Sequence, residues 1–506
     1  MEFISKSKFV LLIATLLFLL VTGYFYRNII LSFRFVDEEY NFAIGRYLTK
    51  NEVLYDDIIT NHQPITHILS GIIQKYAKPN TTYLLIDRHR TFIIIWSTIW
   101  ALFLTAYFGW TAFLFVLIYE LTKSQLLGNL FLAETLTTYP LVFLIGLTCF
   151  KKSKFAKWEL ILVGICLTLL TFLLGPIWPV LGLIIIILFY KQRNNLKFTL
   201  FYLALGILPI ILLVFKYSSL LGYLKIYLYT NLTYTVPNYH TDYYHESWAL
   251  TIFKAMITPV LSLSSEGTDP ILWITKALSF LFIISLIYLI FKKKYLQAVV
   301  SFLLLGLTNI RFVWPGRGGY GGFHLLPWYA SLIFISTAFF IKRLKVAYII
   351  LIVLALWASL IYAKSELFIK RDLSKDYEIN YSTYTDLGQI IRIIRKPQDT
   401  LFVSRDAWLV YWQSDANHIP KLFGYYTWMA GIPYINDKVI QAFTTNPPTL
   451  IYCEDCLSSD LGQYLNQYAE VRRYGGKTGL YVLPERLKNL THDQKDQLRF
   501  YGVESN

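Results

Sequence analysis

Three consecutive carboxylates, Asp37, Glu38 and Glu39, follow the first long apolar run of the chain. A carboxylate can remove the proton of a hydroxyl group as a general base, and it also favours the first turn of a helix, where the helix dipole is positive. A helix over 36–48 would carry Tyr40 on its apolar face and Asp37 on another. The pattern predicts an amphipathic helix along the membrane interface, with the acids either as a cap or as a catalytic group.

The same loop adds further groups that suit a charged substrate. The stretch "YDDIITNHQPITH" (55–67) contributes His62, and "IDRHRTF" (86–92) places Arg88 and Arg90 before the next apolar run. Cations at this position could neutralise a lipid-borne phosphate, and they could equally anchor a helix at the interface. We expect His62 and Tyr40 to line a substrate cavity.

The composition of the chain indicates that these charged and polar groups belong to a membrane protein. Of the 506 residues, 55% are hydrophobic and only 16% are charged, whereas about a quarter of a soluble chain is charged. The apolar residues fall in blocks long enough to cross a hydrocarbon core. The net charge of +15 lies mainly in short loops between those blocks, which is the positive-inside pattern of cytoplasmic loops. No basic run carries the interleaved aromatic residues of a nucleic-acid platform, so nucleic acid is not an expected partner.

The sequence predicts a mainly α-helical polytopic protein with about eleven transmembrane helices, a cytoplasmic amino terminus and an extracytoplasmic carboxy-terminal domain. The expected spans are 9–30, 91–107, 110–122, 126–150, 158–175, 177–190, 198–215, 271–291, 295–310, 323–341 and 346–363.

The expected domain organisation follows from this map. Residues 1–363 form the membrane domain, with a first outer loop at 31–90 and a second at 216–270. Residues 364–398 form a linker. Residues 399–506 form a small soluble α/β domain, with strands at 399–406, 448–455 and 479–484 and a helix at 460–470.

Three other features carry chemistry. Arg311 and Arg317 lie in the glycine-rich outer turn "RFVWPGRGGYGGFH" (311–324), which could hold an anion or could be a plain turn. Glu134 lies near a membrane boundary, where an unpaired carboxylate is costly, so we expect it to be paired or functional. Cys453 and Cys456 form one CxxC, either a local disulfide or free thiols.

The order of these features resembles the GT-C glycosyltransferases, specifically the family of dolichyl-phosphate-mannose protein mannosyltransferases and lipid A aminoarabinose transferases. The segment "VDEEYNFAIGRYLTKNEVLYDD" (36–57) looks like that family's first outer loop, and "NHQPITHIL" (61–69) takes the place of its His/Lys-Pro-Pro segment, with Gln63 where a proline is usual. The likeness covers roughly residues 1–340.

Weaker matches extend the resemblance. "LAETLTTYPLVFLIGLTCF" (132–150) is similar to a family span that begins with an acidic residue, which implies a site role for Glu134. "LTFLLGPIWPVLGL" (170–183) is similar to a Leu-Thr-Lys-Gly-Pro span, but Leu174 replaces the lysine. "FHLLPWYASLIFIS" (323–336) is similar to an Arg-Tyr-Leu-Leu-Pro span, with His324 in place of tyrosine. We expect His324 and Glu134 to line the substrate cavity together with Tyr40 and His62.

The resemblance implies an inverting transfer of a sugar from a polyprenyl-phosphate donor to an acceptor hydroxyl. By position Asp37 would be the general base and Glu38 its neighbour, and Arg88, Arg90, Arg311 and Arg317 would be candidates for holding the donor phosphate. The acceptor is a protein, a lipid or a glycan. No cofactor is required, and a divalent metal held by Asp37, Glu38 and His62 stays open. The alternatives are a lipid or oligosaccharide transporter, or a membrane-anchored binding protein without catalysis.

Overall fold

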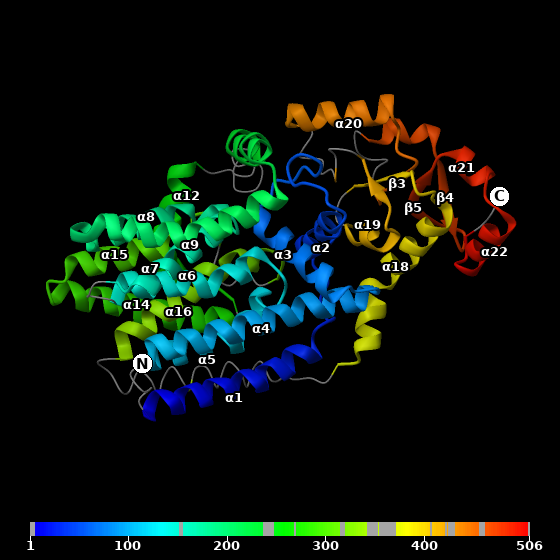
Figure 1. Ribbon diagram of the computed structural model, residues 1–506. Coiled ribbons are helices and arrows are strands. Elements are labelled where there is room, and N and C mark those ends of the chain that lie inside the picture. The colour runs from blue at the N-terminus through cyan, green and yellow to red at the C-terminus, as the bar shows by residue number, and fades with distance from the viewer. Residues whose placement is uncertain are drawn as a thin grey trace. The chain divides into compact units, whose positions relative to one another are not determined.

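The computed structural model describes residues 6–150, 155–235, 247–267, 270–313, 319–341, 353, 371–404, 407–419, 423, 431–454 and 461–503. It is mostly helical and divides into two compact units (Figure 1). Unit 1 comprises 1–30, 89–214 and 244–371, and unit 2 comprises 31–88, 215–243 and 372–506. The two predicted outer loops thus contribute most of their length to the same unit as the carboxy-terminal region, a grouping that differs from the predicted boundaries at 363 and 398.

Unit 1 is a bundle of apolar helices. They are α1 (Lys6–Asn28), α4 (Thr82–Phe108, whose first turns belong to unit 2), α5 (Trp110–Thr122), α6 (Ala133–Phe150), α7 (Lys157–Thr171), α8 (Trp178–Lys191), α9 (Leu196–Tyr217), α12 (Trp248–Met256), α13 (Thr258–Ser264), α14 (Pro270–Phe291), α15 (Tyr295–Leu307) and α16 (Leu326–Ile341). Short 3₁₀ turns lie at Lys123–Leu126, Gly175–Ile177, Arg193–Asn195 and Gly319–Leu325. Within the bundle α16 packs against α5, α6 and α14 (Figure 1).

Five helices among the described residues are long and apolar enough to cross a membrane: Lys8–Asn28, Thr82–Phe108, Arg193–Tyr217, Pro270–Phe291 and Gly322–Phe339. Their presence indicates a membrane protein, which confirms the broad expectation. The predicted number of about eleven spans is wrong for these residues. Several predicted spans are real helices that are too short, such as α5 with 13 residues and α8 with 14. The predicted span 346–363 lies outside the described residues except for Val353.

The surface of unit 1 fits a lipid environment. Large apolar side chains are exposed along the long helices, among them Val10, Leu17 and Leu20 of α1 and Phe201, Leu208 and Leu212 of α9. A soluble monomer rarely exposes contiguous apolar surface on this scale. The exposed faces therefore identify these helices as elements that contact lipid.

Unit 2 surrounds a pair of helices, α2 (Val36–Thr49) and α3 (Pro64–Ala77), that pack against each other. The first outer loop was expected to lie along the membrane interface, yet ten of the fourteen residues of α2 are buried. Its carboxyl end is fixed by Arg46 and Lys50, which contact Oδ1 of Asp415 at 3.2 Å and 2.9 Å. Helix α2 is thus a core element of unit 2.

The remaining elements of unit 2 come from the second loop and the carboxy-terminal region. They are α10 (Leu220–Gly222), the π-helical turns Tyr223–Tyr229 and Asn231–Thr235, α18 (Leu373–Ile394), α19 (Leu409–Ser414), α20 (Pro433–Thr445), the 3₁₀ turn Gly462–Gln467, α21 (Pro484–Lys488) and α22 (His492–Phe500). Helix α18 occupies much of the predicted linker and packs against α19 and α22.

A five-stranded mixed sheet forms the centre of the carboxy-terminal region, with strand order β2-β1-β3-β5-β4. The strands are β1 (Thr400–Val403), β2 (Asn417–His418), β3 (Leu450–Tyr452), β4 (Ala469–Arg473) and β5 (Gly476–Val482). Strand β1 pairs parallel to β2 and β3, whereas β5 pairs antiparallel to β3 and β4. The three predicted strands are therefore present.

The predicted helix at 460–470 is only partly correct. A 3₁₀ turn covers Gly462–Gln467, and the chain then enters β4. A two-residue connection, Tyr474 and Gly475, joins β4 to β5, and both residues have positive φ, as the tight hairpin turn of type I′ requires. The sequence analysis did not predict this hairpin because Ala469–Arg473 lacks the clear alternation of polar and apolar residues that indicates a strand.

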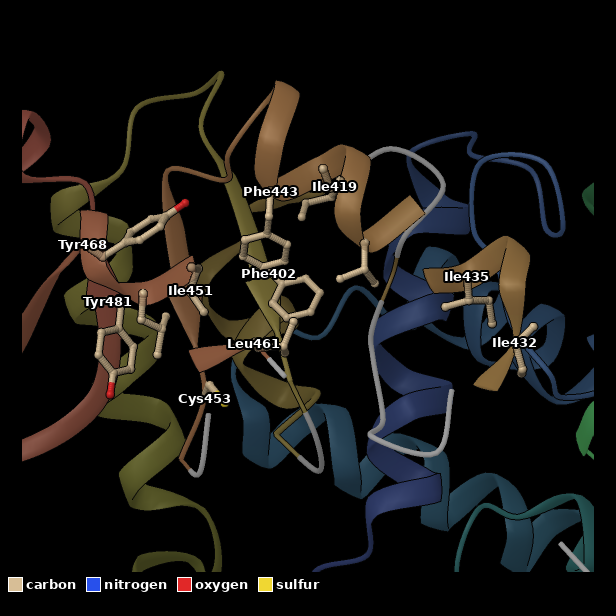
Figure 2. Close-up of a cluster of buried hydrophobic side chains, with 13 residues drawn as sticks. Phe402, Ile419, Ile432, Ile435, Phe443, Ile451, Cys453, Leu461, Tyr468 and Tyr481 are labelled. Atoms are coloured by element: carbon tan, nitrogen blue, oxygen red, sulfur yellow. The ribbon is translucent and has the colours of Figure 1, made fainter. Parts of the chain in front are cut away.

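Helix α20 covers one face of this sheet. Phe443 of α20 meets Phe402 of β1 with ring centroids 5.1 Å apart, and Ile451 of β3 lies in the same cluster (Figure 2). Tyr468 and Tyr481 extend the cluster toward the β4–β5 hairpin. This apolar layer holds α20 against the sheet.

Candidate functional site

The three acids of the first loop occupy the first turn of α2 and differ in environment. Asp37 is half-buried, whereas Glu38 and Glu39 are each only 1% exposed. Phe35 precedes the helix in an extended conformation and provides no side-chain cap, so the acids are the polar groups nearest the free N–H groups of this turn. Asp37 is the most accessible carboxylate of the three.

Glu39 is held by an ion pair that the sequence reasoning did not anticipate. Arg34 contacts it with two bonds, Nε to Oε1 at 2.5 Å and Nη2 to Oε2 at 3.1 Å. The guanidinium also lies 4.0 Å from the ring centroid of Tyr384. Burial opposes the charge of Arg34, but Glu39 outweighs burial, and the pKa of Arg34 is raised. This ion pair fixes the start of α2. Because both carboxylate oxygens of Glu39 contact Arg34, Glu39 is a poor candidate for a general base.

Tyr40 and His62 lie together in an aromatic cluster. The ring of Tyr40 is 5.0 Å from His62, 5.7 Å from His67, 5.0 Å from Trp408 and 5.5 Å from Phe423, measured between centroids. Burial raises the pKa of Tyr40, so its hydroxyl stays protonated. Tyr40 and His62, which were predicted to line a cavity, are therefore neighbours. Tyr40 lies one helical turn after Asp37.

The predicted arginine pair divides. Arg88 is half exposed, and its Nη1 lies 3.9 Å from Asp87. Arg90 is 2% exposed, and its Nη1 donates to the carbonyl of Ile30 at 2.5 Å. The geometry of Arg90 favours a structural role in unit 1, and Arg88 keeps an accessible charge.

A second group of predicted residues meets inside unit 1. Glu134, in the first turn of α6, is 5% exposed, and its Oε1 lies 2.9 Å from Nδ1 of His324. Nη1 of Arg311 lies 3.2 Å from the same nitrogen. The two ends of the segment 311–324 thus meet Glu134, which precedes His324 by 190 residues in the sequence.

The shared nitrogen determines how this group can act. A single imidazole nitrogen cannot donate to Glu134 and accept from Arg311 at the same time. Two acceptors facing each other would be unfavourable, so the favoured arrangement is Nδ1–H donating to Glu134. Arg311 then keeps its N–H donors for another acceptor, and a guanidinium suits the paired oxygens of a phosphate.

These residues line a small, partly open cleft. Its other walls are Leu174 and Pro176, which precede α8, together with Asn309 and Pro327. Leu174 makes an apolar wall of this cleft. Among the described residues that line this cleft, Arg311 is the side chain with a permanent positive charge.

The remaining predicted features can be placed briefly. Arg317 lies outside the described residues, as does Cys456, whereas Cys453 is disulfide-bonded. Among the described residues no group of three or more His, Cys, Asp or Glu side chains could hold a metal ion. A disulfide is typical of a compartment outside the cytoplasm.

Two residues at the start of α3 have a place near the site that the sequence analysis did not assign to them. Gln63 and His67 are buried, and the ring of His67 packs against Tyr40 and His62. A histidine five residues after His62, on the far side of Pro64, was the available signal.

No family model matches the chain, and no curated protein matches it.

Proposed function

We propose that this chain is an integral membrane glycosyltransferase of the GT-C kind. It would move a sugar from a polyprenyl-phosphate donor to an acceptor hydroxyl with inversion at the anomeric carbon. In this proposal Asp37 is the general base, and Arg311 binds the donor phosphate. The active site faces the outside of a cell membrane, the amino terminus is cytoplasmic, and the carboxy-terminal region is extracytoplasmic.

The observation that carries the proposal is the cleft of Glu134, His324 and Arg311. A buried carboxylate orients the imidazole, and the imidazole leaves the guanidinium able to bind an anion. A leaving phosphate develops negative charge as the glycosidic bond breaks, and a fixed cation stabilises that charge. The apolar walls at Leu174 and Pro176 suit a ligand that carries a lipid chain.

The chemistry requires a second group to accept a proton. The oxygen of the acceptor forms a bond to the anomeric carbon, the bond from that carbon to the phosphate oxygen breaks, and the acceptor proton passes to a base. Asp37 is the half-buried acid of α2, whereas Glu38 and Glu39 are each only 1% exposed. This division favours Asp37 over its two neighbours.

Substitution of Arg311 tests the proposal. Membranes carrying the wild type or Arg311→Gln are incubated with radiolabelled polyprenyl-phosphate sugars. Loss of one preorganised charge contact costs roughly 10²–10³ in rate, so transfer should fall by that factor. Arg193→Gln is the matched control, because Arg193 is an exposed arginine of unit 1 that does not line the cleft. Equal transfer by wild type and Arg311→Gln would refute the role of Arg311.

One buried ion pair is the feature against which a second candidate, a lipid or oligosaccharide transporter, can be weighed. Lys123 Nζ lies 2.7 Å from Glu120 Oε2 and 2.9 Å from Ser97 Oγ, and the side chains of the pair are 1–3% exposed. Buried charges among apolar helices often mark a transport pathway. Here every contact is satisfied within the bundle, which favours a structural pair. Flipping of a lipid-linked sugar in proteoliposomes that Lys123→Met abolishes would support transport.

A further inference from the structure

The first turn of α3 concentrates buried polar atoms that have no hydrogen-bond partner. Fifteen buried side-chain nitrogen and oxygen atoms of the described residues lack a partner, and four of them fall within Gln63–His67. They are Nε2 of Gln63, Oγ1 of Thr66, and both Nδ1 and Nε2 of His67. Burying such a group without a partner is destabilising, so four in one turn point to a group that the protein binds there.

The side chains concerned are deeply buried. His67 is 0% exposed, Thr66 3% and Gln63 5%. The turn is the amino terminus of a fourteen-residue helix, where the helix dipole is positive and favours an oxygen ligand. His62 and Asn61, directly before it, are only partly buried and mark the side from which this turn can be approached.

Aromatic rings wall this turn. Tyr40 lies 5.7 Å and His62 6.1 Å from His67 between ring centroids. On another side the hydroxyl of Tyr223 donates to Oε1 of Gln63 at 3.2 Å, which fixes the amide so that its Nε2 is the free end. The rings offer apolar faces beside a set of polar atoms, and this combination suits a ligand with both C–H and O–H surface.

The polar atoms select the chemistry of that ligand. Burial and the neighbouring His62 lower the pKa of His67, so its ring is neutral and presents one donor and one acceptor. The hydroxyl of Thr66 can also donate and accept, and the amide nitrogen of Gln63 donates. An anion would leave the imidazole acceptor unused, and a cation would face the positive end of α3. Hydroxyl groups both donate and accept and so match this mixture of donors and acceptors, and more than one is needed because Nδ1 and Nε2 of His67 point away from each other.

We propose that Gln63, Thr66 and His67, walled by Tyr40 and His62, form a binding site for a neutral polyhydroxylated ligand of the sugar class. The site belongs to unit 2 and depends on no step of the proposed transfer. It would equally serve a chain that binds a glycan without reacting with it. Binding therefore can be tested separately from catalysis.

The test uses the full chain in phospholipid nanodiscs, free of glycoside detergent. Ring-¹⁵N histidine labelling gives few signals, because the chain has eight histidines, and His67→Phe identifies the signal of His67. The probes are the methyl glycosides of glucose, mannose, galactose and arabinose. At least one should shift the ring signals of His67 and raise the midpoint of thermal unfolding, since a ligand of the folded state stabilises it.

Isosteric substitution supplies the control. Thr66→Val keeps the shape of the side chain and removes the hydroxyl, so affinity should fall roughly three- to tenfold. Thr137→Val removes another buried, unpartnered hydroxyl, in α6 of unit 1, and should leave binding unchanged. The proposal is overturned if no glycoside moves the His67 signals, which would indicate a bound water alone. It is also overturned if Thr66→Val binds as tightly as the wild type.

Discussion

The ion pair between Arg34 and Glu39 makes an asymmetric stability prediction. The side chain of Glu39 is 2% exposed and that of Arg34 is 24% exposed. Replacement of Arg34 by Met leaves a buried carboxylate without its cation, and removal of one partner of a buried pair costs about 3–5 kcal/mol. Because Arg34 is partly exposed, we expect the lower end, about 3 kcal/mol.

The reverse substitution should cost less. In Glu39→Gln the guanidinium can still be hydrated and stays stacked on Tyr384, so the loss should be about 1–2 kcal/mol, the worth of a charged hydrogen bond. For a chain of 506 residues the midpoint shifts by about 1 °C per kcal/mol, so Arg34→Met should lower it by roughly 3 °C and Glu39→Gln by roughly 1–2 °C.

Thermal unfolding of the purified full chain, followed by near-ultraviolet circular dichroism, measures both variants and the double substitution. The double variant should be more stable than the sum of the single losses predicts, because the two side chains are coupled. An equal or larger loss in Glu39→Gln than in Arg34→Met would refute the reasoning, as would strict additivity.

Two further predictions concern unit 2. A Cβ atom on Gly45 would lie 2.4 Å from Oγ of Ser70, so Gly45→Ala should force α2 and α3 apart and lower the free energy of unfolding by about 1–3 kcal/mol in a thermal melt; an unchanged midpoint would contradict this close approach. Burial alone would raise the pKa of Asp415, but Lys50 and Arg46 outweigh burial, and the pKa is lowered. The ionised Asp415 therefore stabilises the folded state fully above its unfolded pKa of about 3.9, and this stabilisation is lost as the pH falls through the folded pKa. The stability difference between wild type and Asp415→Asn should therefore shrink only below about pH 4, and a difference that shrinks near neutral pH would contradict this assignment.

Local patterns in the sequence predicted individual elements well. The apolar blocks at 198–215 and 271–291 became α9 and α14, and the β-rich runs at 399–406 and 448–455 became β1 and β3. These elements follow from composition over one segment. The block at 126–150 was overextended, because a 3₁₀ turn at Lys123–Leu126 and a following turn delay α6 until Ala133.

Contacts between distant segments could not be predicted in the same way. Residue type and position singled out Glu134, Arg311 and His324 one by one, but nothing in the sequence states that His324 lies between the other two. The burial of α2 was also missed, since its amphipathic pattern fits an interfacial helix as well as a helix packed on α3. The contacts of His324 and the burial of α2 both depend on which elements pack together, and that is a property of the tertiary fold.

The most direct test of the central proposal is transfer of radiolabelled sugar from mixed polyprenyl-phosphate sugars in membranes that carry wild type or Asp37→Asn at equal expression. Asparagine keeps the shape of the side chain but cannot accept the proton. Asp56→Asn, at an exposed carboxylate of the same loop, is the control. The proposal predicts that wild type and the control label an acceptor and that Asp37→Asn does not. Labelling by Asp37→Asn at the wild-type rate would show that Asp37 is only a helix cap and would contradict the mechanism.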